Sequence, residues 1–332
     1  MIIKDFNQVK ETYARAAEQG WVLPCICSEN QTTTEAIISA ASDFGRTHGI
    51  KDVPVIIAIT VNYDHRSQAS NYTHSRDWKT GLRLFLGDIE ALAGKGGIYD
   101  DVHVMIHLDH IQHDVDRALW DGDLSAYSSI MFDASSLPFD KNIELTARFV
   151  EKKGKSILIE GACDEIMDAT GEQTNDLTTP ANAERYMRET GVDMIVANLG
   201  TEHRASGREL MYHGEQARAI KAKTGAKIVL HGASSVSNEQ VKGLFDDGVC
   251  KVNIWTALER DSSPVLFENL VRNASKTAGD TTVEKLIREG YLTEKCKTGD
   301  KINLGYFTTL YRQDIVFSVM KDMAYAYFDL WY

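Results

Sequence analysis

Short apolar runs alternate with longer segments of mixed polarity along most of the chain. Eight of these runs are rich in β-branched or aliphatic residues and have apolar interiors such as VPVIIAIT. Such interiors are typical of strands covered on both faces of a parallel sheet. The predicted strands are Val22–Cys27, Val53–Thr60, His103–Asp109, Ser129–Asp133, Ser156–Ala162, Met194–Leu199, Lys227–Ala233 and Val249–Trp255.

Segments with helical spacing lie between these strands: Thr33–Thr47, Asp77–Ala93, Val115–Asp121, Ile143–Lys153, Asn182–Thr190, Glu209–Thr224 and Asn238–Asp246. The alternation predicts an α/β fold, a (β/α)8 TIM barrel in a single domain over residues 1–332. The barrel would cover about residues 20–257 and a helical C-terminal extension about 258–332. An open doubly wound sheet is the alternative, but its G-x-G-x-x-G turn does not occur in the sequence.

Composition and charge narrow the classes of function. The 332 residues are 43% hydrophobic and carry a net charge of −12, which argues against a basic face for nucleic acid. Apolar runs fall short of the roughly 18 residues that cross a bilayer, and the N-terminus lacks the apolar core of a signal peptide. We therefore expect a soluble, cytoplasmic protein with no membrane partner. The five cysteines lie mostly in strand-like runs and are expected to be buried thiols.

Reactive side chains gather where predicted strands end. His110 follows the third strand, His203 follows the sixth, and His231 lies near the end of the seventh. The carboxyl ends of barrel strands meet at one mouth, where three imidazoles can bind Zn²⁺ or another divalent cation. A lone histidine at such a position is more often structural, but three in register favour a metal site. Asp109 is the candidate acid/base, provided that the strand has ended by His110, since adjacent strand residues point oppositely.

The ends of the last two strands offer groups for a phosphate. Gly232 and Ser234 follow the seventh strand, while Asn253 and Thr256 lie at the end of the eighth. Barrels often bind phosphate with the loops after these two strands, although one of the serines could instead cap a helix. A cation bound next to an ene-diolate oxygen would stabilise charge as a carbon–carbon bond breaks. The combination predicts an aldolase that acts on a phosphorylated ketose.

These motifs resemble those of the class II fructose-bisphosphate aldolase family, including its tagatose-bisphosphate members, across about the first 260 residues. HLDH resembles the family's H-x-D-H, LGTEH resembles G-T-A-H, LHGASS resembles L-H-G-G-S-G, and KVNIWTAL resembles K-I-N-x-x-T. The resemblance implies a TIM barrel and reversible cleavage of a ketose 1-phosphate or ketose 1,6-bisphosphate to dihydroxyacetone phosphate and an aldehyde. It further implies a monovalent cation near the phosphate and a homodimer or homotetramer.

The resemblance also assigns roles to individual residues. The implied metal ligands are His110, His203 and His231, and the implied catalytic acid/base is Asp109. The implied residues that bind the sugar phosphate are Gly200, Gly232, Ser234, Asn253 and Thr256.

The chain departs from the family pattern near the fifth predicted strand. Residues 160–164 read EGACD where the family reads E-A-E-L-G, so Ala162 replaces the second acid. In the following loop the family carries an acid for proton transfer at the nucleophilic carbon. We favour Glu172 for that role, with Glu165 as the alternative.

Two further departures concern the aldehyde side. Trp255 stands where the fructose-bisphosphate enzymes have an aspartate, and the loop VNYDHRSQASNYTHSRDW replaces a glycine- and alanine-rich one. We therefore expect an aldehyde other than glyceraldehyde 3-phosphate. Two other functions stay open: a non-catalytic barrel that binds sugar phosphates, and a metal-dependent lyase or epimerase of a sugar acid.

Overall fold

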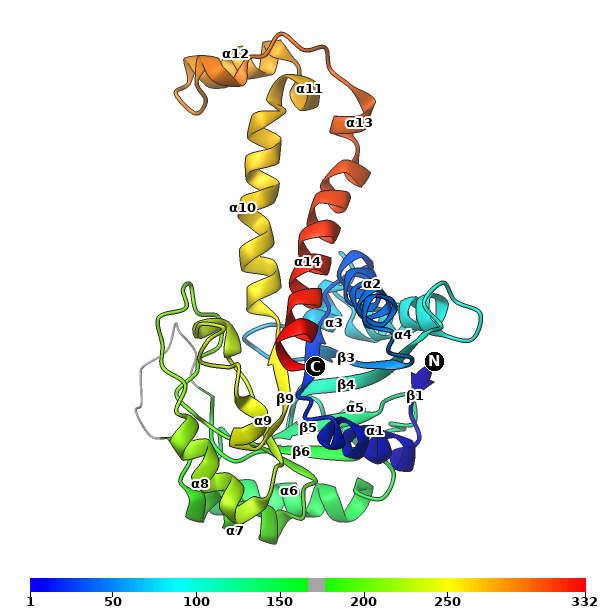
Figure 1. Ribbon diagram of the computed structural model, residues 1–332, viewed down its shortest axis with the longest axis vertical. Helices are drawn as coiled ribbons and strands as arrows, with labels where there is room; N and C mark the ends of the chain where they lie inside the picture. The colour runs from blue at the N-terminus through cyan, green and yellow to red at the C-terminus, as the bar shows by residue number, and fades with distance from the viewer. Residues whose placement is uncertain (167–176) are drawn as a thin grey trace.

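The computed structural model describes residues 1–166 and 177–332. Eight parallel strands form a closed barrel, because β4 pairs with β5 and so joins the two ends of the strand order (Figure 1). The prediction of a TIM barrel with C-terminal helices is confirmed. The strands are β2 (Leu23–Cys27), β3 (Val53–Thr60), β4 (Val102–Gln112), β5 (Ser129–Asp133), β6 (Leu158–Ala162), β7 (Met194–Val196), β8 (Ile228–Leu230) and β9 (Val249–Ile254).

The register of the strands brings particular residues to the mouth of the barrel. Cys25 pairs with Asn253 across β2 and β9, and Thr60 pairs with Asp109 across β3 and β4. Parallel strands keep their carboxyl ends at the same edge. Chain segments far apart in the sequence therefore present their last residues to one cavity.

Helices cover the outside of the barrel close to the predicted positions. The side chain of Thr179 accepts a hydrogen bond from the Asn182 N–H and so caps α7. One predicted helix is wrong, because residues 238–243 form turns before a short α9, with Gly243 directly ahead of it. The helices are α2 (Gln31–His48), α3 (Gln68–Asn71), α4 (Trp78–Ala93), α5 (Arg117–Trp120), α6 (Phe139–Lys153), α7 (Pro180–Thr190), α8 (Gly214–Thr224) and α9 (Leu244–Asp247).

The amino-terminal end of the barrel is closed by elements that the alternation of strands and helices did not predict. Strand β1 (Ile2–Ile3) pairs with the start of β4, and α1 (Phe6–Glu18) follows it. Val9 and Ala16 of α1 pack against the apolar side chains inside the barrel. The barrel therefore opens at its carboxyl end, where the reactive residues lie.

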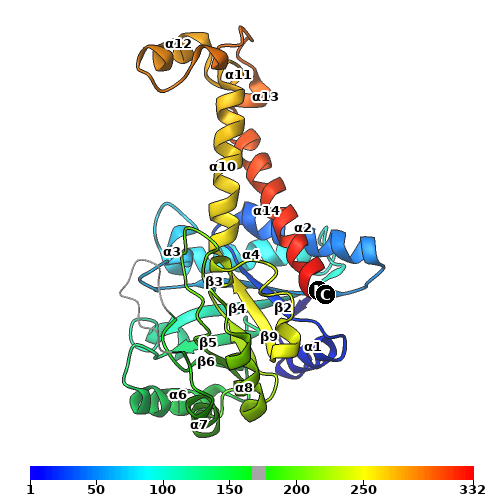
Figure 2. The same cartoon turned by 60° about the vertical axis from the view of Figure 1, so that its left-hand side comes forward.

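A helical arm projects from the barrel (Figures 1 and 2). Helix α10 leaves the mouth and α14 returns beside it to pack on α2. The last residue of the chain, Tyr332, stacks on Trp21 with ring centroids 4.5 Å apart, so the terminal aromatic residues pack on their own barrel. The elements of the arm are α10 (Thr256–Arg272), α11 (Ala274–Ala278), α12 (Asp280–Arg288), η2 (Glu294–Cys296), α13 (Leu304–Phe307) and α14 (Thr309–Trp331). In the described part of the chain, no helix has the length and apolar character needed to span a bilayer.

Candidate active site

The structure brings together the three histidines predicted as metal ligands. One ligand nitrogen from each of His110, His203 and His231 lies within 4.8 Å of the others. Burial lowers the pKa of His231 well below its ordinary value, so its ring is neutral and keeps a lone pair. Its Nε2 is buried without a hydrogen-bond partner among the described residues. Three imidazoles converging from separate elements are a donor set that suits Zn²⁺ or a similar divalent cation.

A bulge in β4 allows Asp109 and His110 to face the same cavity. The pairing of β4 with β5 shifts register between Leu108 and Ile111, and His110 adopts a left-handed backbone with φ of 46°. Both Asp109 and His110 line the cavity. The expectation that the strand ends by His110 is wrong, since β4 continues to Gln112. The extra residue of the bulge, and not the end of the strand, breaks the alternation of side chains.

Hydrogen bonds and packing fix the ring of His110. Its Nδ1 lies 2.8 Å from Oδ2 of Asp133, whose other oxygen accepts hydrogen bonds from the N–H and hydroxyl of Ser135. Although burial opposes ionisation, these hydrogen bonds hold the pKa of Asp133 at about 2. The ring of Tyr63 stacks on the ring of His110, with centroids 4.4 Å apart and nearly parallel planes. The Nδ1 position is therefore occupied by Asp133, and Nε2 is the nitrogen directed toward a cation.

Asp109 is held beside the histidines as a carboxylate. Nδ2 of Asn253 donates a hydrogen bond of 2.8 Å to Oδ1, and the thiol of Cys27 lies 3.4 Å from Oδ2. Burial would raise the pKa of Asp109, but the charge of His110 and a contact with His107 lower it well below its ordinary value. Asp109 can therefore accept a proton from a bound hydroxyl group.

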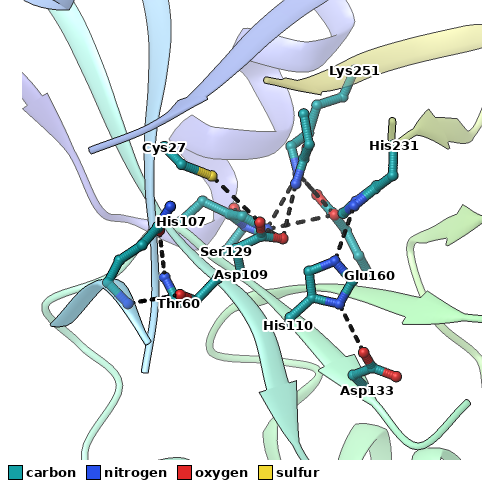
Figure 3. A network of polar contacts seen from close by, with 12 residues as sticks. Cys27, Thr60, His107, Asp109, His110, Ser129, Asp133, Glu160, His231 and Lys251 are labelled. Carbon is teal, nitrogen blue, oxygen red and sulfur yellow. Dashed lines mark hydrogen bonds and ion pairs between the residues drawn. The ribbon is translucent and has the colours of Figure 1, made fainter. Parts of the chain in front are cut away.

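A buried polar network lies beneath Asp109, inside the barrel. Nζ of Lys251 lies 2.6 and 2.8 Å from the two carboxylate oxygens of Glu160, and 3.2 Å from Nε2 of His107. The Nδ1 of His107 is 2.8 Å from the hydroxyl of Ser129. Figure 3 shows Lys251, Glu160 and His107 directed toward one another around Asp109. The motifs of the sequence gave no sign of the Lys251–Glu160 pair.

The predicted phosphate-binding residues lie along the same cavity, with one exception. Gly232, Ser234, Asn253 and Thr256 line it, and Oδ1 of Asn253 is buried without a hydrogen-bond partner in the described part of the chain. Gly232 has φ of 69°, and a Cβ there would lie 2.8 Å from the backbone of residue 202. This glycine therefore permits close packing of the loops after β7 and β8.

Gly200 and Glu172 are placed differently. Gly200 does not line the cavity, and a Cβ there would lie 2.4 Å from the ring of His213, so this glycine packs inside the loop after β7. Glu172 lies outside the described residues. Glu165, the alternative, lines a neighbouring polar pocket together with Asp133 and Ala162.

A cluster at the other side of the mouth was only partly visible in the sequence. Arg66 forms a salt bridge with Glu29, which follows β2, and lies over the ring of Trp255 at 5.1 Å from its centroid. The sequence singled out Trp255 and the polar loop after β3. It did not connect either of them to Glu29, because that contact joins positions far apart in the chain.

Comparisons with known proteins agree with this geometry. The chain is 29% identical to the fructose-bisphosphate aldolase of Streptococcus pneumoniae over 278 residues, which cover 80% of this chain and 83% of that protein. Its fold resembles the crystal structure of fructose-bisphosphate aldolase from Campylobacter jejuni, with a TM-score of 0.76 and 18% identity over 99% of this chain and 95% of that one. It also resembles the YdjI aldolase from Escherichia coli K12, with a TM-score of 0.66 and 18% identity over 100% and 97% of the two chains.

A sequence profile of the family described as Fructose-bisphosphate aldolase class-II matches residues 7–302. That match spans the barrel and most of the arm. The resemblance inferred from the motifs is therefore confirmed, and this chain belongs to the class II fructose-bisphosphate aldolase family.

Proposed function

We propose that this protein is a divalent-metal-dependent aldolase. It reversibly cleaves a ketose 1-phosphate or ketose 1,6-bisphosphate to dihydroxyacetone phosphate and an aldehyde. The observation that carries the proposal is the presence, in one cavity, of the three histidines, the ionised Asp109 and four of the five residues predicted to bind the sugar phosphate. Bound to His110, His203 and His231, a cation such as Zn²⁺ would act as a Lewis acid and stabilise negative charge on a substrate oxygen.

Acidic residues of the chain carry out the two proton transfers that the reaction needs. In cleavage, Asp109 accepts the proton of the hydroxyl group on the carbon that becomes the aldehyde. The carbon–carbon bond breaks, a carbonyl forms on the aldehyde, and the electron pair stays with the three-carbon ketose fragment. A second acid, which we assign to Glu172, then delivers a proton to that fragment. Asn253 holds Asp109 in place through its 2.8 Å hydrogen bond.

We assign the binding of the phosphate to the loops after β8 and β9. Gly232 and Ser234 offer backbone N–H groups, and Ser234 and Thr256 offer hydroxyls at the cavity. Thr256 also begins the 17-residue helix α10, whose amino-terminal end favours an anion. A monovalent cation next to this phosphate would lower the KM for the sugar phosphate, which a titration with K⁺ measures.

A condensation assay tests the proposed reaction. The metal-loaded protein is incubated with dihydroxyacetone phosphate and a panel of aldehydes, with and without EDTA, and the products are measured by mass spectrometry. We expect condensed ketose phosphates that disappear with EDTA and return when the cation is restored. Absence of any product, or product formation that EDTA leaves unchanged, would contradict the proposal.

Substitution of Asp109, the proposed acid/base, gives a more specific test. Asp109→Asn should lower kcat by about 10²- to 10⁴-fold, which is the usual contribution of a positioned acid/base. The matched control is Asp140→Asn, because Asp140 is 79% exposed on the outside of the barrel. If the two variants turn over the same substrates equally well, Asp109 is not the acid/base.

We further propose that the protein forms a homodimer or homotetramer through the arm. Large apolar side chains near its far end are exposed, which is unusual for a monomer. They are Phe267, Tyr291, Ile302, Leu304 and Leu310. Sedimentation velocity should show a species of two or four chains, and Phe267→Glu with Leu310→Glu should shift it toward the monomer. A wild-type protein that sediments as a monomer at micromolar concentration would refute the proposal.

A further inference from the structure

The loop after β3 crosses the mouth of the barrel. Strands β3 and β7 lie on opposite sides of the barrel, yet the loop after β3 contacts the loop after β7. Its residues 61–67 read VNYDHRS and belong to the stretch that departs from the family pattern. Two of its rings, those of Tyr63 and His65, line both the catalytic cavity and the neighbouring polar pocket. The proposed reaction assigns no role to either ring.

Hydrogen bonds to the barrel fix the path of this loop. Nδ2 of Asn62 donates a hydrogen bond of 2.7 Å to Oδ1 of Asp116, which follows β4. At the other end, the side chain of the buried Gln68 accepts a hydrogen bond of 2.9 Å from the N–H of Thr60. The N–H of Gln68 donates one of 3.1 Å to the hydroxyl of Thr60 in return. The residues between these anchors therefore keep a defined position over the cavity.

Tyr63 supports the face of the His110 ring. The two rings stack with centroids 4.4 Å apart and an angle of 3° between their planes. Nδ1 of His110 lies 2.8 Å from Oδ2 of Asp133 (Figure 3). A hydrogen bond at Nδ1 fixes one atom of the ring, but the ring can still tilt about that contact. The stack on Tyr63 fixes the plane of the ring, so the two contacts together define the direction of Nε2.

His65 extends this support to the loop that carries His203. The rings of His65 and Tyr63 meet edge to face, with centroids 4.9 Å apart. Nη2 of Arg204 lies 3.1 Å from Nδ1 of His65, and Nδ1 accepts this hydrogen bond because a guanidinium only donates. Arg204 directly follows His203, one of the proposed ligands. Contacts therefore run without a gap from His110 through Tyr63 and His65 to the residue next to His203.

We propose that Tyr63 is a positioning residue for the proposed metal site. It holds the plane of His110, and the contact of His65 with Arg204 ties the loop after β3 to a second loop that carries a ligand. Two of the three imidazoles are thus oriented before the cation binds, which lowers the loss of conformational freedom on binding. His65 is exposed, so we expect the smaller share of the effect from it. This inference rests on the divalent cation of the proposed function.

Zinc titrations on the full-length protein test the inference without any aldol substrate. A chromophoric chelator competes for the zinc, and Tyr63→Leu is compared with Tyr63→Phe, which keeps a ring that can stack. We expect Tyr63→Leu to weaken zinc binding by about threefold to tenfold, which is the contribution of one stacked aromatic pair. Tyr63→Phe should bind zinc as the wild-type protein does, and His65→Ala should lose less affinity than Tyr63→Leu. The matched control is Tyr291→Leu, because Tyr291 is 77% exposed on the arm.

Cobalt in place of zinc reports the geometry of the ligands. The visible absorption bands of bound Co²⁺ should shift or broaden in Tyr63→Leu and keep the wild-type form in Tyr63→Phe, a contrast that a general loss of stability would not produce. Tyr63→Met replaces the leucine variant if circular dichroism shows that the latter does not fold. The inference is wrong if the folded variant without the ring binds zinc and cobalt as the control does, or if Tyr63→Phe loses as much affinity as Tyr63→Leu. If the wild-type protein binds no zinc, the proposed function itself fails.

Discussion

Replacing Lys251 with methionine tests the polar network inside the barrel. Lys251 and Glu160 are fully buried, and their side chains lie 2.6 Å apart at the closest pair of atoms. Methionine fills a similar volume but leaves the Glu160 carboxylate without its partner. Removing one member of a buried ion pair typically costs about 3–5 kcal/mol. We therefore expect the free energy of unfolding to fall by about that amount. Part of the loss should come from His107, whose Nε2 lies 3.2 Å from Nζ of Lys251 and loses this contact.

Urea denaturation at pH 7.5, followed by circular dichroism and tryptophan fluorescence, measures this loss. The double variant Lys251→Met with Glu160→Gln should recover about 2 kcal/mol or more of it, because no unpaired charge remains in the barrel. The matched control is Lys321→Met, which removes a partly exposed pair with Asp43 and should cost less than about 1 kcal/mol. The reasoning is refuted if Lys251→Met costs no more than the control, or if the losses of the two single variants simply add in the double variant.

Three other predictions concern the proposed metal site and the acid Glu259 in the first turn of α10. Asp133→Asn should weaken the hold on His110 and lower zinc affinity by about 10- to 100-fold in a titration against a chromophoric chelator; an unchanged affinity would exclude this role. His231→Ala should reduce the zinc that stays bound after dialysis, measured by plasma mass spectrometry, and retention of the wild-type amount would remove His231 from the ligand set. Glu259 has a pKa raised to about 7 in the folded protein, so its contribution to stability is fully present below its unfolded value near 4.5 and is lost as the pH rises through 7. The gain in unfolding free energy from Glu259→Gln should therefore grow by about 1–3 kcal/mol between pH 4 and pH 8, and a gain independent of pH would contradict it.

The barrel could be predicted because each of its strands and helices is indicated by a short, local stretch of the sequence. Each buried strand is a short apolar run between polar helices, and a (β/α)8 topology brings the ends of such strands to one mouth. That topology brings His110, His203 and His231 to one mouth, because each lies near the carboxyl end of a strand. The bulge in β4, which the sequence did not predict, turns His110 into the cavity.

The parts that could not be predicted depend on backbone detail or on distant contacts. No residue preference in the sequence indicates the left-handed φ of His110, so the bulge replaced the predicted strand end. The pairing of Lys251 with Glu160 and that of Arg66 with Glu29 join positions 91 and 37 residues apart. Such pairs become visible only when the register of the strands is known. The packing of Gly200 against His213 likewise depends on the path of one loop.

The separation of the histidines from the contacts of Arg66 has a consequence for how this mouth can vary. The proposed ligands of the cation come from β4 and from the loops after β7 and β8, whereas Arg66, Glu29 and Trp255 come from the loops after β3, β2 and β9. Substitutions in this second group change the wall of the cavity and leave the three imidazoles in place.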